Sequence, residues 1–144
     1  MQEKNYDFKQ KWFEYLGYKP HDGQIPLHFP KKHDARFQVV VCGRRFGKTW
    51  ASAMEATYVA SRPNKRIWVV GMSYKKARLI FREIWQRMVI GHPEDVDKAS
   101  EKDMYIRFKW GTIVEGMSAD NPSSLVGEGL DLLVIDEVAK MNKK

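Results

Sequence analysis

The sequence contains a single cysteine, Cys42, among its 144 residues, so no internal disulfide can form. It also lacks the run of about 20 apolar residues that a membrane-spanning helix needs. The N-terminal residues Met1 to Lys4 lack the apolar stretch of a secretion signal. These absences predict a chain that folds in a reducing compartment and has no membrane partner.

The composition is that of a globular domain, with 43% apolar and 30% charged residues. The formal net charge is +7, and a basic surface attracts polyanions, of which nucleic acid is the usual one. The alternative is that the charge serves only solubility.

Strand patterns and helix patterns alternate along the chain, which predicts an α/β fold with a parallel sheet covered by helices. Helices are expected at 5–18, 48–61 and 74–90, and strands at 37–42, 66–72 and 131–136. A hairpin is expected at 104–109 and 112–117, an extended connector at 19–35, and a loop at 118–130. One apolar face is predicted for the 74–90 helix, made of Ala77, Ile80, Phe81, Ile84, Trp85 and Met88.

The strongest functional pattern is VVVCGRRFGKTW, in which a predicted strand runs through a turn into a predicted helix. In such a turn, here Gly43 to Gly47 with Phe46 inside it, backbone N–H groups cradle phosphates. Lys48 is then placed to reach the β- and γ-phosphates, and the Thr49 hydroxyl to hold Mg²⁺. The pattern departs from the usual one because Cys42 occupies the first glycine position and Gly43 follows it.

Two arginines, Arg44 and Arg45, lie inside this turn. A guanidinium forks onto phosphate oxygens through two N–H bonds, so one of the pair is a candidate sensor of the γ-phosphate. The alternative is that both pair with surface carboxylates.

A second pattern is the apolar run Leu132 to Ile135, which ends in Asp136 and Glu137. Ligands of open α/β sheets bind at the carboxyl ends of strands. Asp136 is expected to hold Mg²⁺ through water, and Glu137 to orient and deprotonate the attacking water. Upstream, the amide of Gln24 has the donor and acceptor needed to contact the adenine edge, although a solvated loop residue is the alternative.

Taken in order, these segments resemble the ATPase domain of phage large terminases, the motors that package viral DNA. The resemblance covers about Lys19 to Met141, and its most specific part runs from Gly111 through Leu125-Val126-Gly127-Glu128-Gly129 to Asp136-Glu137. An arginine after the first glycine and before Gly-Lys-Thr is a known variation of the terminase turn.

The resemblance implies a P-loop NTPase fold of the ASCE type, with a mostly parallel sheet flanked by helices and truncated after the strand that ends at Asp136. It implies that Gln24 contacts adenine, that Arg44 contacts the γ-phosphate, and that Glu137 is the catalytic carboxylate. ATP and Mg²⁺ are the implied cofactors. The implied partners are double-stranded DNA, a portal protein, a small terminase subunit and further copies in a ring, in the cytoplasm of a host cell.

We expect residues 1–36 to form an N-terminal helix with an adenine-side connector, and residues 37–144 to form a P-loop ATPase core. Because large terminases continue into further strands and a nuclease domain, the chain is expected to be a fragment without nuclease residues. Two other functions stay open. One is a helicase-like translocase, and the other is a catalytically silent piece that binds nucleotide or DNA.

Overall fold

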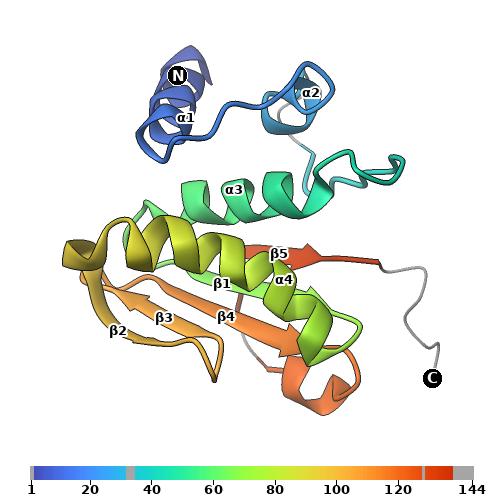
Figure 1. Ribbon diagram of the computed structural model, residues 1–144, viewed down its shortest axis with the longest axis vertical. Helices are drawn as coiled ribbons and strands as arrows, with labels where there is room; N and C mark the ends of the chain where they lie inside the picture. Colours follow the sequence, from blue (N-terminus) through green and yellow to red (C-terminus); the bar gives the residue numbers. More distant parts are fainter. Residues whose placement is uncertain (1, 32–34, 128, 138–144) are drawn as a thin grey trace.

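The computed structural model describes residues 2–31, 35–127 and 129–137, and within them five strands form one sheet of order β2-β3-β4-β1-β5 (Figure 1). In its centre, β1 (Arg66–Gly71) pairs in parallel with both β4 (Ile113–Ser118) and β5 (Leu132–Ile135). Next to β4, β3 (Tyr105–Phe108) is antiparallel, and β2 (Val96–Ser100) is antiparallel to β3. The α/β class and the 104–117 hairpin are confirmed, whereas β2 was not expected.

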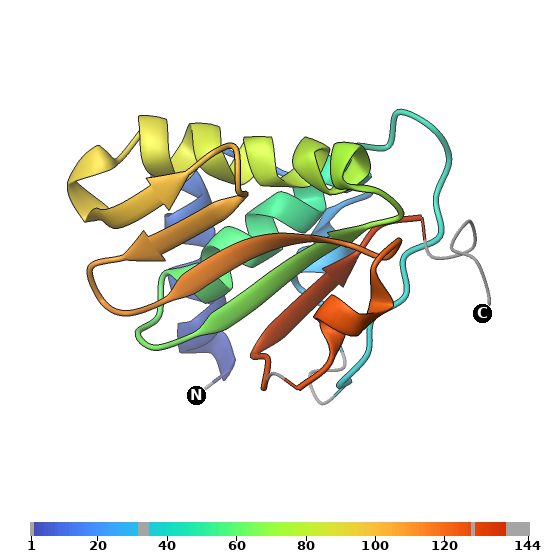
Figure 2. The ribbon, with the colours of Figure 1, turned by 90° about the horizontal axis from the view of Figure 1, so that it is seen from below.

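The helices lie on one face of the sheet in two layers (Figures 1 and 2). α3 (Lys48–Ala60) and α4 (Tyr74–Ile84) contact the strands, and α1 (Gln2–Tyr15) and α2 (Ile25–His28) pack beyond α3. A π-helical segment, η1 (Trp85–Ile90), continues α4, and the short 3-10 turns are η2 (Pro93–Asp95) and η3 (Pro122–Leu125).

One core cluster fills the space between the sheet, α3 and α4 and continues to α1 through Phe13 and Leu16. The predicted apolar face of the 74–90 helix is confirmed, since Ala77, Ile80, Phe81, Ile84 and Met88 are all fully buried and Trp85 is half-buried. Contact between α4 and β1 is so close that a Cβ at Gly71 would lie 2.3 Å from the backbone nitrogen of Ala77. Only glycine allows this approach, which fixes the start of α4 against the carboxyl end of β1.

The strand predicted at 37–42 is wrong. This segment is extended, but it lies outside the sheet, and the side chains of Val39 and Val41 are 86% and 92% exposed. A β-branched run favours extended backbone, but a strand also needs a ladder partner beside it, and the described residues supply none. The turn before α3 is therefore approached by an unpaired segment.

The connector predicted at 19–35 is extended only in part. Residues Ile25–His28 form α2, with Pro26 in the first turn, where its missing N–H costs nothing. This short helix places Gln24 beside Gly47, just before α3, and His28 beside Glu55 in the middle of α3. In the described ranges no helix is both long and apolar enough to cross a membrane.

Candidate active site

The turn between residues 43 and 47 leads directly into α3. Gly47 is the residue before the helix and has a φ of +85°, and Arg45 has a φ of +63°. These two left-handed residues turn the chain sharply before Lys48. The first N–H groups of a helix have no intrahelical acceptor, so they form an anion-binding end.

Lys48 bends back over this turn. Its Nζ donates hydrogen bonds to the carbonyl oxygens of Cys42 and Gly43, at 3.1 Å each. The ammonium group is therefore held against the residues that begin the turn. Thr49, the second residue of α3, is half-buried beside it.

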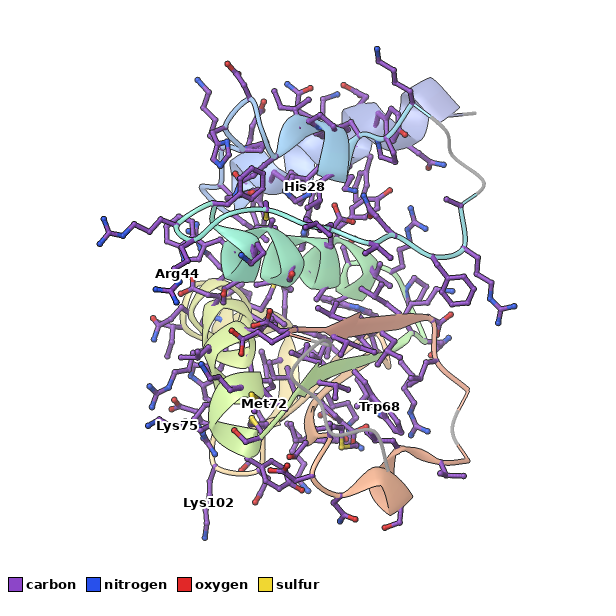
Figure 3. All side chains as sticks on the ribbon, turned by 90° about the vertical axis from the view of Figure 1, so that its right-hand side faces the viewer. His28, Arg44, Trp68, Met72, Lys75 and Lys102 are labelled. Carbon is purple, nitrogen blue, oxygen red and sulfur yellow. The ribbon has the colours of Figure 1, made fainter. Side chains whose placement is uncertain are left out.

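Both arginines of the turn are exposed, and in the described part of the chain neither pairs with a carboxylate. Figure 3 shows Arg44 at the edge of the molecule, on the same side as Lys75. The guanidinium groups are thus accessible to an anion from solvent.

The connector grips the other side of the turn. Gln24, which is 4% exposed, donates from Nε2 to the carbonyls of Phe46 and Gly47 at 3.3 and 3.2 Å. The His21 ring nitrogen Nε2 is 2.9 Å from the same Phe46 carbonyl oxygen. The imidazole ring of His21 also packs edge to face against the Phe46 ring, with the ring centroids 5.0 Å apart. This contact of His21 was not predicted from the sequence, because nothing in its spacing indicates contact with a turn 25 residues away.

The acidic pair follows β5. The Asp136 N–H donates to the Val70 carbonyl at 3.0 Å and so extends the pairing of β5 with β1. Glu137 has a φ of +55°, is half-buried, and has an oxygen 4.0 Å from Nζ of Lys76 near the start of α4. The sequence did not predict that Lys76 lies near Glu137, since only the packing of α4 on β1 brings it there.

Figures 1 and 2 agree that the carboxyl end of β5 and the turn before α3 lie at the same end of the sheet. A hollow adjoins the turn, lined by Gly23, Pro26, Leu27, Gln38, Val39–Cys42 and Phe46. Its lining is about equally polar and apolar. The roles predicted for the individual site residues, adenine contact by Gln24 included, stay predictions.

The chain is similar to known proteins over most of its length. It is 29% identical to the large terminase subunit of Thermus virus P23-45 and 28% identical to that of Thermus phage G20c, with 90% of this chain covered in each case. It spans 30% of the length of both subunits. No protein-family model matches the chain.

Among solved structures, the chain is similar to the large terminase ATPase domain of Thermus phage P74-26, with a TM-score of 0.78 and 27% identity. The match covers 92% of this chain and 59% of that domain. The resemblance to phage large terminases is therefore confirmed in sequence and in fold.

Proposed function

We propose that this chain, as a relative of the ATPase part of phage large terminases, binds ATP with Mg²⁺ and hydrolyses it. The observation that carries the proposal is the shared end of the sheet, where the turn from Gly43 to Gly47 and the carboxyl end of β5, which Asp136 and Glu137 follow, both lie. The similarity to a terminase ATPase domain adds independent support.

The residues of the turn divide the work on the phosphates. The free N–H groups at the start of α3 bind phosphate oxygens, and Lys48 exchanges its two carbonyl partners for the β- and γ-phosphates. Arg44, and Arg45 beside it, add guanidinium groups from the exposed side of the turn.

Thr49 and Asp136 fit Mg²⁺, because a hydroxyl and a carboxylate leave the remaining positions for water and phosphate oxygen, which this ion prefers. When bound, the ion supplies positive charge against the phosphate oxygens. Glu137 orients the attacking water and accepts its proton. The hollow beside Phe46 receives the adenine ring, close to Gln24, which follows Gly23 of its lining.

For the whole protein we propose that ATP hydrolysis moves double-stranded DNA into a viral capsid. Copies of the protein act as a ring together with a portal protein and a small terminase subunit, inside the host cell. The basic net charge of +7 suits contact with the DNA backbone.

The test is a titration of a fluorescent ATP analogue, with and without Mg²⁺, on the wild type, Lys48→Ala and a matched control, Lys102→Ala. Lys102 is exposed at another edge of the molecule (Figure 3), so this control removes the same charge away from the turn. A charge-assisted contact is worth about 1.5–3 kcal/mol, which predicts affinity about 10- to 100-fold weaker in Lys48→Ala only.

Turnover gives the second half of the test. Glu137→Gln should retain nucleotide affinity and lose hydrolysis, because the amide cannot accept the proton of water. Equal affinities of the wild type and Lys48→Ala for the nucleotide would rule the proposed site out.

A further inference from the structure

A largely buried network of polar side chains connects α3 with the connector. The Glu55 carboxylate lies 2.5 Å from Nδ1 of His28, and Nε2 of His28 lies 2.9 Å from the Tyr18 hydroxyl. His28 is fully buried between α2 and α3 (Figure 3), and Tyr18 is 4% exposed. Buried polar groups that are this well paired hold their neighbours in one geometry.

Glu55 is itself held in place by α1. Nζ of Lys9 lies 2.6 Å from the same carboxylate oxygen and donates to the His28 carbonyl at 2.7 Å, and Lys9 is 6% exposed. A buried ammonium and a carboxylate that satisfy each other have little freedom to move. The ring of His28 is therefore held by Glu55 of α3 and by the Tyr18 hydroxyl, and Lys9 of α1 fixes both Glu55 and the His28 backbone.

The network of side chains continues from Tyr18 to Gln24. The Tyr18 hydroxyl is 3.2 Å from Oε1 of Gln24, and the same oxygen accepts from the His21 backbone N–H at 3.1 Å. Burial and the nearby Glu55 carboxylate raise the pKa of Tyr18 to about 12, so the hydroxyl keeps its proton in any neutral buffer. With its oxygen held, Gln24 can present its NH₂ group in only one direction.

That direction is toward the turn, where Nε2 of Gln24 bonds the carbonyls of Phe46 and Gly47. A trans peptide is planar, with its C=O and N–H pointing in opposite directions. Holding the Phe46 carbonyl therefore turns the Gly47 N–H away from Gln24, and holding the Gly47 carbonyl does the same for the Lys48 N–H. These are two of the N–H groups that an anion at the start of α3 would use.

We propose that Tyr18, His28 and Glu55 are positioning residues for the phosphate turn, acting through Gln24 to aim the Gly47 and Lys48 N–H groups at a bound phosphate. The proposal rests on the nucleotide-binding function proposed above. None of the four side chains needs to touch nucleotide for this role. Because the Gln24 amide uses both donors and both acceptor positions within the protein, any contact with adenine in this arrangement is one of packing.

The matched pair of variants is Tyr18→Phe and Tyr15→Phe. Tyr15 also bonds a histidine through its hydroxyl, at 2.8 Å from Nδ1 of His92, but it lies on the exposed side of α1. Each variant removes one hydroxyl that bonds a histidine, and only the first interrupts the path to the turn. Gln24→Glu is a second test, since a carboxylate retains the acceptor for Tyr18 and lacks the donor for the turn.

Amide hydrogen exchange measures the effect without nucleotide. The Ala51 N–H donates to the Gly47 carbonyl at 2.9 Å, so its exchange rate reports on the peptide that Gln24 holds. We expect Ala51 to exchange about fivefold faster in Tyr18→Phe, as the loss of one hydrogen bond implies, and faster still in Gln24→Glu. The amides of β1 should be unchanged, which separates a local effect from global destabilisation.

Binding of the fluorescent ATP analogue should weaken about fivefold in Tyr18→Phe, at least as much in Gln24→Glu, and not in Tyr15→Phe. For Tyr18→Phe, kcat at saturating ATP should stay within twofold of the wild type. Unchanged Ala51 exchange and affinity in Tyr18→Phe and Gln24→Glu would overturn the proposal. So would faster exchange that spreads equally to β1, because the network would then serve general stability. Failure of the nucleotide function itself is recognised separately, by equal affinities of the wild type and Lys48→Ala.

Discussion

Replacing Gly47 with alanine should disturb the turn through two separate effects. The backbone φ of +85° is unfavourable for any residue with a Cβ, and the added carbon would lie 2.7 Å from Nε2 of Gln24. The Gln24 amide must therefore move, although it is held on its other side by Tyr18.

The two effects have different magnitudes. The left-handed conformation costs alanine about 1–2 kcal/mol. Displacing Gln24 removes two hydrogen bonds to the turn, each worth about 0.5–1.5 kcal/mol net, so the total loss is about 2–5 kcal/mol.

A double-mutant cycle separates these contributions. Gln24→Ala removes both the clash and the hydrogen bonds. The double variant therefore loses the hydrogen bonds only once and carries the backbone strain at residue 47 only once. Urea unfolding of the four proteins should give a double variant about 1–3 kcal/mol more stable than the sum of the single changes predicts. Strict additivity would refute the contact between Gln24 and Gly47.

Three other predictions concern the scaffold and use the same unfolding assay. Tyr18→Phe should remove a pH dependence of the free energy of unfolding. The pKa of Tyr18 is about 12 in the folded protein and about 10 in the unfolded chain, which gives the wild type about 2–3 kcal/mol of stability that is present below pH 10 and lost as the pH rises through 12. An unchanged alkaline profile in the variant would contradict this. Gly71→Ala should lower the free energy of unfolding by about 3 kcal/mol or more, because its Cβ would clash with the backbone of α4. The control Gly129→Ala, whose Cβ has no atom within 4 Å, should change it by less than about 0.5 kcal/mol. Equal effects would contradict the packing of α4. Phe81→Ala should cost about 3–5 kcal/mol because the ring is fully buried, and a loss below 1 kcal/mol would place it outside the core.

Apolar periodicity predicted the elements that bury one continuous face. α4 and η1 follow the 74–90 pattern, β5 follows the apolar run before Asp136, and the hairpin of β3 and β4 follows its alternation. In these elements the same side chains that create the pattern also make the core, so local sequence and tertiary packing agree.

Agreement ended where structure depended on a distant partner. Residues 37–42 have strand composition but no neighbouring strand in the described chain, and β2 pairs as an edge strand despite carrying Asp97 and Lys98. The site shows the same division. The turn and the carboxylates after β5 were visible as local patterns, whereas the grip of His21 and Gln24 on the turn exists only because α2 folds the connector back onto α3.

The exposed segment beside the turn also affects how the protein behaves in a test tube. Large apolar side chains are exposed to solvent in this segment, at Phe37, Val39 and Val41. In the described sheet β5 is an edge strand, and its Leu133 and Ile135 are partly exposed as well. Exposed apolar patches and unpaired edge strands favour self-association as the protein concentration rises. Light scattering at each working concentration should therefore precede any titration, so that aggregation is not mistaken for a signal of nucleotide binding.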